Sequence, residues 1–204
     1  NCCYSDITIF SFHPVKIITT GEGGMAVTNN RNLATIMQRL RSHGITRDPS
    51  EMVSAPDGSW YYQQLDLGFN YRMTDIQAAL GLSQLKRLEK FVVKRNSLSR
   101  RYNELLKDLP ITIPWQHPDC FSACHLYIIR ITPEFGLDRN TVHKKLFAKG
   151  IHTTVHYKPL HTFSFFKNSS LKNKKFPNSI KAFTECLSLP LYPKITDIQQ
   201  DYVI

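Results

Sequence analysis

Residues 11–24 read SFHPVKIITTGEGG and place a lysine, Lys16, between a strand-like run and a glycine-rich turn. The preceding run, 7–12, is rich in β-branched and aromatic residues and predicts a buried strand, which Pro14 ends. A second short strand is expected at 25–28, after the turn. A lysine that bonds to a carbonyl must attack as a neutral amine and be held rigidly, and a strand end among polar groups allows this. On these residues alone, an exposed turn lysine is the commoner outcome.

The next part of the chain is expected to be mostly helical. The pattern predicts a helix from Asn30, its N-cap, to a stop at Gly44. Residues 45–69 show little periodicity and predict an irregular surface excursion. The segment 74–77, Thr-Asp-Ile-Gln, has the capping-box pattern, and the apolar stripe after it predicts one long helix over much of 75–107.

Strand and helix signals alternate in the C-terminal part. An apolar run predicts a strand at 126–131, and a helix over about 138–149 should end at Gly150. Another strand is expected at 151–157, and a further helix within 178–187. This β-α-β type of succession indicates a small α/β domain.

Both ends of the sequence suggest a larger fold. Two short strands and one helix within residues 1–72 cannot cover both faces of a sheet. A second capping-box pattern at 196–199 begins a helix, and the chain stops at Ile204. We therefore expect the chain to be part of something longer.

Composition narrows the class of protein. The 204 residues are 42% hydrophobic, as in a globular chain, and carry a formal net charge of +10. Because the basic residues are mostly scattered, nucleic-acid binding is not expected, and a diphosphate-bearing substrate is an equally simple reason for positive charge. No run approaches the roughly 20 apolar residues of a membrane helix, and the start lacks the layout of a signal peptide. A cytoplasmic location without membrane contact is the expectation.

The cysteines indicate neither disulfides nor a metal site. Five cysteines, with one adjacent pair, lack the spacing of a disulfide framework or of paired zinc ligands. Cys120, Cys124 and His125 resemble a partial ligand set, but no second cluster accompanies them. Free thiols and no metal are therefore expected.

Two motifs resemble one enzyme family. The segment 11–24 resembles the lysine segment of the DegT/DnrJ/StrS family of pyridoxal-phosphate (PLP)-dependent sugar aminotransferases. Residues 68–79, GFNYRMTDIQAA, resemble the second signature of that family. Segments 41–48, 156–161 and 188–191 are most similar to a branch that acts on UDP-linked 4-keto-6-deoxy-N-acetylhexosamines in pseudaminic-acid-type sugar biosynthesis.

The resemblance implies an α/β fold of the aspartate-aminotransferase type, PLP fold type I. Its order implies a C-terminal fragment, with a remnant of the large domain followed by the small C-terminal α/β domain. The expected divisions are 1–72 for the remnant of the large PLP-binding domain, 73–109 for a long connecting helix, and 110–204 for the small domain.

Residue roles follow from the same resemblance. Lys16 is implied to be the catalytic lysine that bonds to PLP and moves a proton between the sugar C4 and the cofactor. Ser11 is implied to bind the cofactor phosphate, and Asn70 to reach the phosphate in the other subunit of a homodimer, so that active sites are shared. We expect His156, Tyr157 and His161 to help to enclose the nucleotide sugar, although structural hydrogen bonding is an equally good interpretation of each.

The implied reaction is transfer of an amino group from an amino acid, glutamate in most relatives, to C4 of the UDP-sugar. In the family the acid that faces the pyridine nitrogen precedes the lysine strand, outside this chain, so the chain alone is expected to be inactive. The family pattern Phe-Pro-Asn-Ala-Glu appears at 176–180 as Phe-Pro-Asn-Ser-Ile. A catalytically inactive remnant and a basic binding module that borrows the fold stay open as alternatives.

Overall fold

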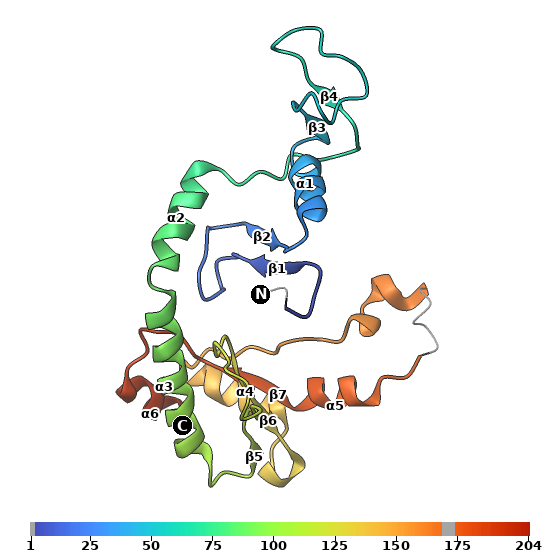
Figure 1. Ribbon diagram of the computed structural model, residues 1–204. Helices are drawn as coiled ribbons and strands as arrows, with labels where there is room; N and C mark the ends of the chain where they lie inside the picture. Colours follow the sequence, from blue (N-terminus) through green and yellow to red (C-terminus); the bar gives the residue numbers. More distant parts are fainter. Residues whose placement is uncertain (1–2, 169–173) are drawn as a thin grey trace. The chain divides into compact units, whose positions relative to one another are not determined.

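The structure, a computed structural model, describes residues 3–168 and 174–204. The chain divides into two compact units, Asn1–Leu88 (unit 1) and Glu89–Ile204 (unit 2), and each is described by itself. Figure 1 gives the element labels used below. No helix among the described residues is long and apolar enough to cross a membrane.

Unit 1 begins with a two-stranded antiparallel sheet. β1 (Thr8–Ser11) pairs with β2 (Gly24–Val27), so that Ser11 lies opposite Gly24. Both expected strands are present, each within a residue or two of its expected bounds. The expectation that the first strand is buried was wrong, because its residues are alternately exposed and partly buried, and Ile9 is 72% exposed. A loop connects β1 to β2 (Figure 1), and Lys16 lies within this loop in the sequence.

α1 (Arg31–Leu40) has the expected N-cap, because the Asn30 side chain accepts hydrogen bonds from the backbone of Asn32 and Leu33. The helix ends at Leu40, so the expected stop at Gly44 was wrong. Gly44 instead has φ 71°, and a Cβ there would lie only 1.8 Å from the carbonyl oxygen of Asp66. A close backbone contact requires this glycine.

The excursion after α1 is largely irregular, as the pattern predicts. Its regular elements are two short antiparallel strands, β3 (Ile45–Thr46) and β4 (Gln63–Gln64). The ion pair between Arg39 and Asp66, with an Nη2–Oδ2 distance of 2.7 Å, links α1 to the end of the excursion.

The expected single long helix is two helices. α2 (Asp75–Leu85) begins with the expected capping box of Thr74 and Gln77, and α3 (Leu88–Leu106) follows after a short turn. At this turn Arg87 N–H donates to the carbonyl of Gln84, three residues back, at 2.9 Å. This hydrogen bond spans three residues instead of the four of an α-helix, and it interrupts the helix although the turn contains no glycine or proline.

Unit 2 is built on a three-stranded antiparallel sheet. Its order is β5 (Ile111–Thr112), β6 (Tyr127–Ile131), β7 (Cys186–Leu189). The accompanying helices are α4 (Arg139–Ala148), α5 (Pro177–Glu185) and α6 (Asp197–Val203). Short 3-10 turns are η1 (Pro133–Phe135), η2 (Leu160–Thr162) and η3 (Ser164–Asn168).

The expected strand at 151–157 was wrong. Only Thr154 pairs there, in an isolated antiparallel bridge to Ser188 along the edge of β7 that β6 does not occupy. The antiparallel pairing of β6 with β7 therefore replaces the expected β-α-β succession. Gly150, at φ 76°, does follow α4 as expected.

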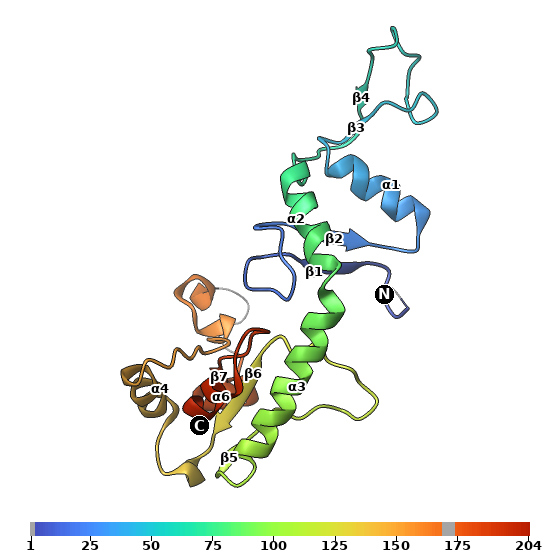
Figure 2. The ribbon, with the colours of Figure 1, turned by 90° about the vertical axis from the view of Figure 1, so that its left-hand side faces the viewer.

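The core of unit 2 lies on one face of its sheet. Alternate residues of β6, Tyr127, Ile129 and Ile131, pack with Tyr102 of α3 and Val203 of α6, and α3 and α6 both lie beside the sheet in Figure 2. By contrast, none of the hydrophobic side chains described in unit 1 is fully buried. The two units thus differ sharply in how much apolar surface they cover.

Candidate functional site

Lys16 ends a tight turn that follows β1. Its backbone N–H donates to the carbonyl of His13 at 2.9 Å, which closes a four-residue turn with Pro14 in the second position. Proline suits that position because its ring fixes φ near the required value. The lysine is partly buried, and its place just after a strand end agrees with the sequence-based expectation.

The base of the lysine loop is closed by hydrogen bonds to Phe12. The Phe12 N–H donates to Gly23 O at 2.9 Å, and the Phe12 carbonyl accepts from Thr20 N at 3.1 Å. The Thr19 hydroxyl donates to the same carbonyl at 2.9 Å. Backbone bonds that fix both ends of the loop restrict the positions open to Lys16.

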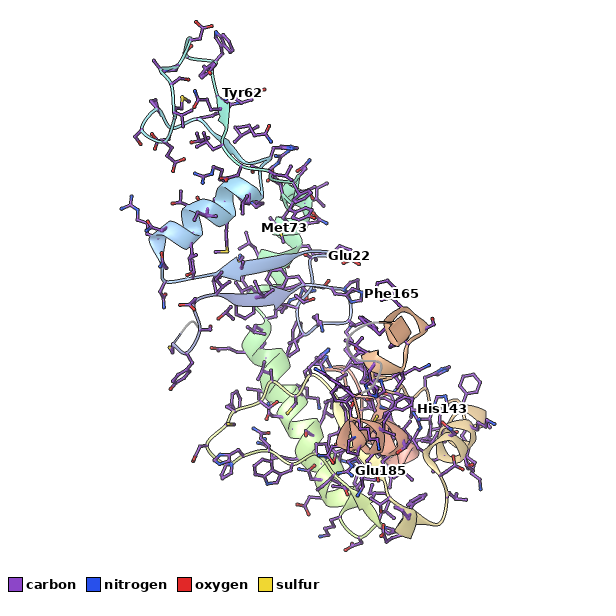
Figure 3. All side chains as sticks on the ribbon, turned by 90° about the vertical axis from the view of Figure 1, so that its right-hand side faces the viewer. Glu22, Tyr62, Met73, His143, Phe165 and Glu185 are labelled. Atoms are coloured by element: carbon purple, nitrogen blue, oxygen red, sulfur yellow. The ribbon has the colours of Figure 1, made fainter. Side chains whose placement is uncertain are left out.

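The return of the loop is held against α2. Thr20, which is 3% exposed, donates its hydroxyl to Glu22 O at 2.6 Å, and Gln77 Nε2 donates to the same oxygen at 3.1 Å. Gly81 allows the approach, since a Cβ there would meet the Thr20 methyl at 2.8 Å. Figure 3 labels Glu22, which lies in this loop, and Met73, which lies just before α2.

Ser11 is joined to Lys16 through His13. Its hydroxyl accepts a hydrogen bond from the His13 N–H at 3.4 Å, while the His13 carbonyl accepts from Lys16. The structure therefore brings Ser11 and Lys16 into one local hydrogen-bonded turn. An amine and an exposed hydroxyl are the kinds of group that fit the aldehyde and the phosphate of PLP.

Asn70 belongs to a different segment of unit 1. Its backbone bridges Ser42, and the flanking N–H groups of Phe69 and Tyr71 donate to Leu40 and Arg41 at 2.9 and 3.0 Å. The rings of Phe69 and Tyr71 stack 5.2 Å apart. These contacts hold residues 69–71 against the end of α1 and leave Asn70 exposed.

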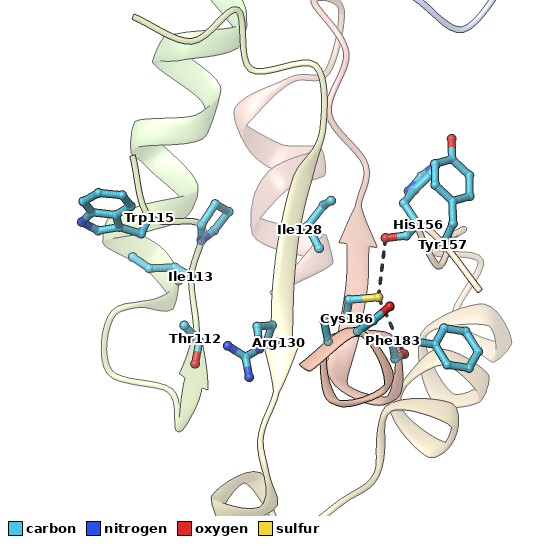
Figure 4. A pocket seen from close by; sticks show the side chains of 12 residues that line it. Thr112, Ile113, Trp115, Ile128, Arg130, His156, Tyr157, Phe183 and Cys186 are labelled. Atoms are coloured by element: carbon cyan, nitrogen blue, oxygen red, sulfur yellow. Dashed lines mark hydrogen bonds between the residues drawn. The ribbon is translucent and has the colours of Figure 1, made fainter. Parts of the chain in front are cut away.

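A pocket of about 440 Å³ in unit 2 contains two of the expected substrate-contacting residues, His156 and Tyr157 (Figure 4). Its volume is in the range of small-molecule sites. His161 does not line it, and its ring packs 4.7 Å from that of Phe176 instead. The full lining is Thr112, Ile113, Pro114, Trp115, Ile128, Arg130, His156, Tyr157, Ser179, Ala182, Phe183 and Cys186.

One wall of this pocket carries an ion pair that sequence reasoning missed. Arg130 Nε donates to Glu185 Oε2 at 2.8 Å, and Arg130 Nη2 also contacts that oxygen. Glu185 is only 8% exposed. The signal was present in the sequence, because Arg130 is the charged residue in an otherwise apolar strand and so marks the face opposite the core.

Cys186 also lines this pocket and is only 6% exposed. Burial raises the pKa of its thiol, although the nearby Arg139 acts in the opposite direction. A buried neutral thiol is a packing group rather than a nucleophile. Among the described residues no group of three or more His, Cys, Asp or Glu side chains is arranged to hold a metal ion.

Comparison with known proteins settles the family. Residues 2–204 match the DegT/DnrJ/EryC1/StrS aminotransferase family. The chain belongs to this family. The resemblance carried by residues 11–24 and 68–79 is thus confirmed.

Two curated relatives illustrate the similarity. The chain is 39% identical over 195 residues to an uncharacterised protein of Methanocaldococcus jannaschii, covering 94% of this chain and 50% of that protein. It is 36% identical over 192 residues to the UDP-4-amino-4,6-dideoxy-N-acetyl-beta-L-altrosamine transaminase of Campylobacter jejuni, covering 94% and 48%. The chain spans about half the length of the curated relatives it matches.

Solved structures confirm the fold class. Helicobacter pylori PseC, an aminotransferase involved in the biosynthesis of pseudoaminic acid, has a TM-score of 0.86 at 29% identity, over 98% of this chain and 52% of that one. The candidate sugar aminotransferase Spr1654 of Streptococcus pneumoniae, in its PLP form, has a TM-score of 0.85 at 32% identity, over 100% and 51%. The expected α/β, aspartate-aminotransferase-like fold is therefore present.

Proposed function

We propose that this chain supplies the lysine-bearing half of a PLP-dependent nucleotide-sugar aminotransferase. The reaction transfers an amino group from an amino acid, glutamate in our expectation, to C4 of a UDP-linked 4-keto-6-deoxy-N-acetylhexosamine, in pseudaminic-acid-type sugar biosynthesis. The observation that carries the proposal is Lys16 on a loop closed at its base, in a chain of this aminotransferase family. The 36% identity to the Campylobacter jejuni transaminase supports the choice of substrate.

Lys16 and Ser11 have distinct roles in this proposal. The Lys16 amine holds the cofactor and moves a proton to and from the sugar C4, which requires a fixed position such as the closed loop provides. The Ser11 hydroxyl donates to the cofactor phosphate from the end of β1. When bound, PLP supplies the electron sink for the carbon that gains or loses the proton.

The other proposed residues contact the cofactor or the substrate. Asn70 donates its amide to the cofactor phosphate in the partner subunit of a homodimer, consistent with its exposed position in unit 1. His156 and Tyr157 contact the nucleotide sugar from the unit 2 pocket. His161, which lies outside that lining, also contacts the nucleotide sugar in this proposal. The proposed location of the whole enzyme is the cytoplasm.

The direct test is covalent capture of the cofactor. In the protein that also contains the N-terminal half of the family fold, borohydride should fix PLP to the lysine that holds it, and peptide mapping should find the label on Lys16. Lys16→Ala should abolish both labelling and turnover.

Lys86→Ala is the matched control, because Lys86 is also in unit 1 but is an exposed residue at the end of α2. It should leave labelling and turnover at the level of the unmodified protein. Label on a lysine other than Lys16 contradicts the assignment, and label on Lys16 without any turnover favours an inactive remnant.

A further inference from the structure

The segment that carries His156 has little secondary structure to fix it. Residues 151–157 form no strand. Their backbone–backbone hydrogen bonds to the sheet are those of one bridge, in which Ser188 N–H donates to Thr154 O at 2.8 Å and Thr154 N–H donates to Ser188 O at 3.3 Å. A histidine two residues beyond a single bridge keeps rotational freedom unless its side chain is held.

The side chain of His156 is held from β7. Its Nδ1 lies 2.7 Å from the Ser188 hydroxyl oxygen, and the thiol of Cys186 donates to the His156 carbonyl at 3.7 Å. Ser188 and Cys186 are 5% and 6% exposed and alternate along the strand, so both side chains leave the same face of β7. Figure 4 shows the Cys186 contact beside the pocket.

We propose that Ser188 is a positioning residue that fixes the orientation in which the His156 ring faces the nucleotide sugar. This rests on the proposed function, in which His156 contacts that substrate. Ser188 does not line the pocket, whereas His156 does, so Ser188 acts on the substrate through the ring.

A hydroxyl suits this task in either protonation state of the ring. It accepts a hydrogen bond from an Nδ1–H and donates one to a bare Nδ1. The ring is therefore held in one orientation before the substrate arrives, and less freedom is lost on binding. The removal of such a bond is expected to weaken binding by roughly three- to tenfold.

Unit 2 contains a matched control. The Thr153 hydroxyl lies 2.6 Å from Nδ1 of His143 on α4, and Thr153 is 7% exposed. This pair repeats the chemistry and burial of Ser188 and His156, but neither member lines the pocket. Thr153 lies in the same segment 151–157, so Thr153→Ala reports the cost of losing a buried hydroxyl-histidine bond that anchors this segment without contacting the His156 ring.

Kinetics of the enzyme with its N-terminal half in place test the coupling. Ser188→Ala should raise KM for the UDP-sugar by roughly three- to tenfold with little change in kcat, while Thr153→Ala should leave both constants unchanged. In a His156→Ala background, Ser188→Ala should add no further rise. An equal rise in that background overturns the proposal, because Ser188 would then act by another route.

A second measurement needs no turnover and so separates this proposal from the proposed function. In protein with ¹⁵N-labelled histidine, solid-state NMR should show the His156 ring signals shifted in Ser188→Ala and unshifted in Thr153→Ala. Ser188→Cys, which fills similar space with a weaker hydrogen-bonding group, should act like Ser188→Ala and replaces it if that variant does not fold. Unshifted His156 signals in both Ser188 variants overturn the proposal even in an active enzyme, whereas shifted signals in an inactive protein count against the proposed function alone.

Discussion

Hydrogen bonds made by neighbouring residues hold the loop that carries Lys16. The turn from His13, the closure at Phe12 and the contact of the loop with Gln77 are all hydrogen bonds that do not involve the lysine side chain. The side chain is thereby presented by a fixed loop while its amine stays available for chemistry. Substitutions at Lys16 should consequently disturb chemistry more than folding.

The first residue-scale prediction concerns the sharing of sites between subunits. If Asn70 serves the partner's cofactor, a dimer that combines a Lys16→Ala subunit with an Asn70→Ala subunit has one site with both residues intact. Each variant alone should be nearly inactive, and mixing should restore up to about half of the activity per mixed dimer. The measurement is turnover after subunit exchange in the enzyme with its N-terminal half.

In the control, either single-substitution subunit is mixed with a subunit that carries both substitutions, because neither site of that mixed dimer has both Lys16 and Asn70. If the first mixture recovers no activity although subunit exchange is demonstrated, Asn70 does not act across the dimer.

A second prediction at this scale comes from Tyr102. The side chain is 0% exposed, and its hydroxyl donates to Pro190 O at 3.0 Å. Burial raises the pKa of Tyr102 to about 12, from 10.0. The pKa of Tyr102 is higher in the folded state than in the unfolded state, so the neutral phenol stabilises the folded state fully below pH 10. This stabilisation is lost as the pH rises through about 12, and the full loss in the free energy of unfolding is about 2–3 kcal/mol by linkage.

Circular dichroism of unfolding between pH 8 and 12 should therefore show a steep alkaline loss of stability, with a smaller slope in Tyr102→Phe. Burial also raises the pKa of Tyr127, whose ring centroid lies 4.9 Å from that of Tyr102, so part of the slope should persist. An unchanged slope in Tyr102→Phe contradicts the assignment of this titration to Tyr102.

At the scale of elements, the N-caps of helices were easier to predict from the sequence than the interruption between α2 and α3. The capping boxes at Thr74 and Thr196 and the N-cap Asn30 are all present, because each depends on a side chain visible in the sequence. The interruption at Lys86 and Arg87 has no such marker, and the apolar stripe continues across it. At this turn the backbone N–H bonds to the carbonyl three residues back instead of four. Such a change requires no particular residue type, so the sequence does not reveal it.

Residues 151–157 show the limit of the strand pattern. Burial alternates there, with Ile151 and Thr153 buried and His152 and Thr154 exposed, as in a strand packed on one face. Alternating burial indicates which side chains face the core, but a strand also needs backbone hydrogen bonds to a neighbouring strand. In this segment only Thr154 makes such a bridge.

The element-scale prediction concerns α6. The Thr196 hydroxyl accepts from Gln199 N–H at 3.2 Å, Gln199 Oε1 accepts from Thr196 N–H at 2.9 Å, and Gln200 Nε2 ties the helix to Leu98 O at 3.0 Å. Thr196→Ala should lower the free energy of unfolding by about 1 kcal/mol, and Thr196→Ser should keep most of it. Urea denaturation of the enzyme with its N-terminal half measures both, and an equal loss in the two variants would refute the capping role.

At the scale of the whole molecule, sequence motifs predicted the family and the fold class, while physical patterns predicted most elements. The strand pattern predicted that the run containing Ile9 is buried, but it could not show what covers that run. In the structure the Ile9 side chain is 72% exposed. The unit 2 pocket was beyond prediction for the same reason, because Trp115, Arg130 and Phe183 meet His156 only through pairing and packing of distant segments.

The last prediction is that the 204-residue chain by itself neither holds PLP firmly nor transaminates. Unit 2 has a buried core, whereas Phe10, Phe12 and Val27 of unit 1 are only partly buried. Burial of such a side chain is worth roughly 1.5–3 kcal/mol, and a domain is stable by only about 5–15 kcal/mol, so several uncovered residues remove much of the margin. The Lys16 loop then lacks the rigid support that covalent catalysis requires.

Sedimentation and PLP absorbance of the isolated chain, compared with the chain joined to its N-terminal half, provide the test. The isolated chain should aggregate through the apolar surface around residues 7–28 and give no amino transfer to a 4-keto UDP-sugar, while the joined protein should be dimeric and active. Lys16 retains its sequence neighbours in both proteins, so the comparison isolates the effect of covering unit 1. A soluble isolated dimer with turnover would mean that the hydrogen-bonded loop alone holds Lys16 well enough for catalysis.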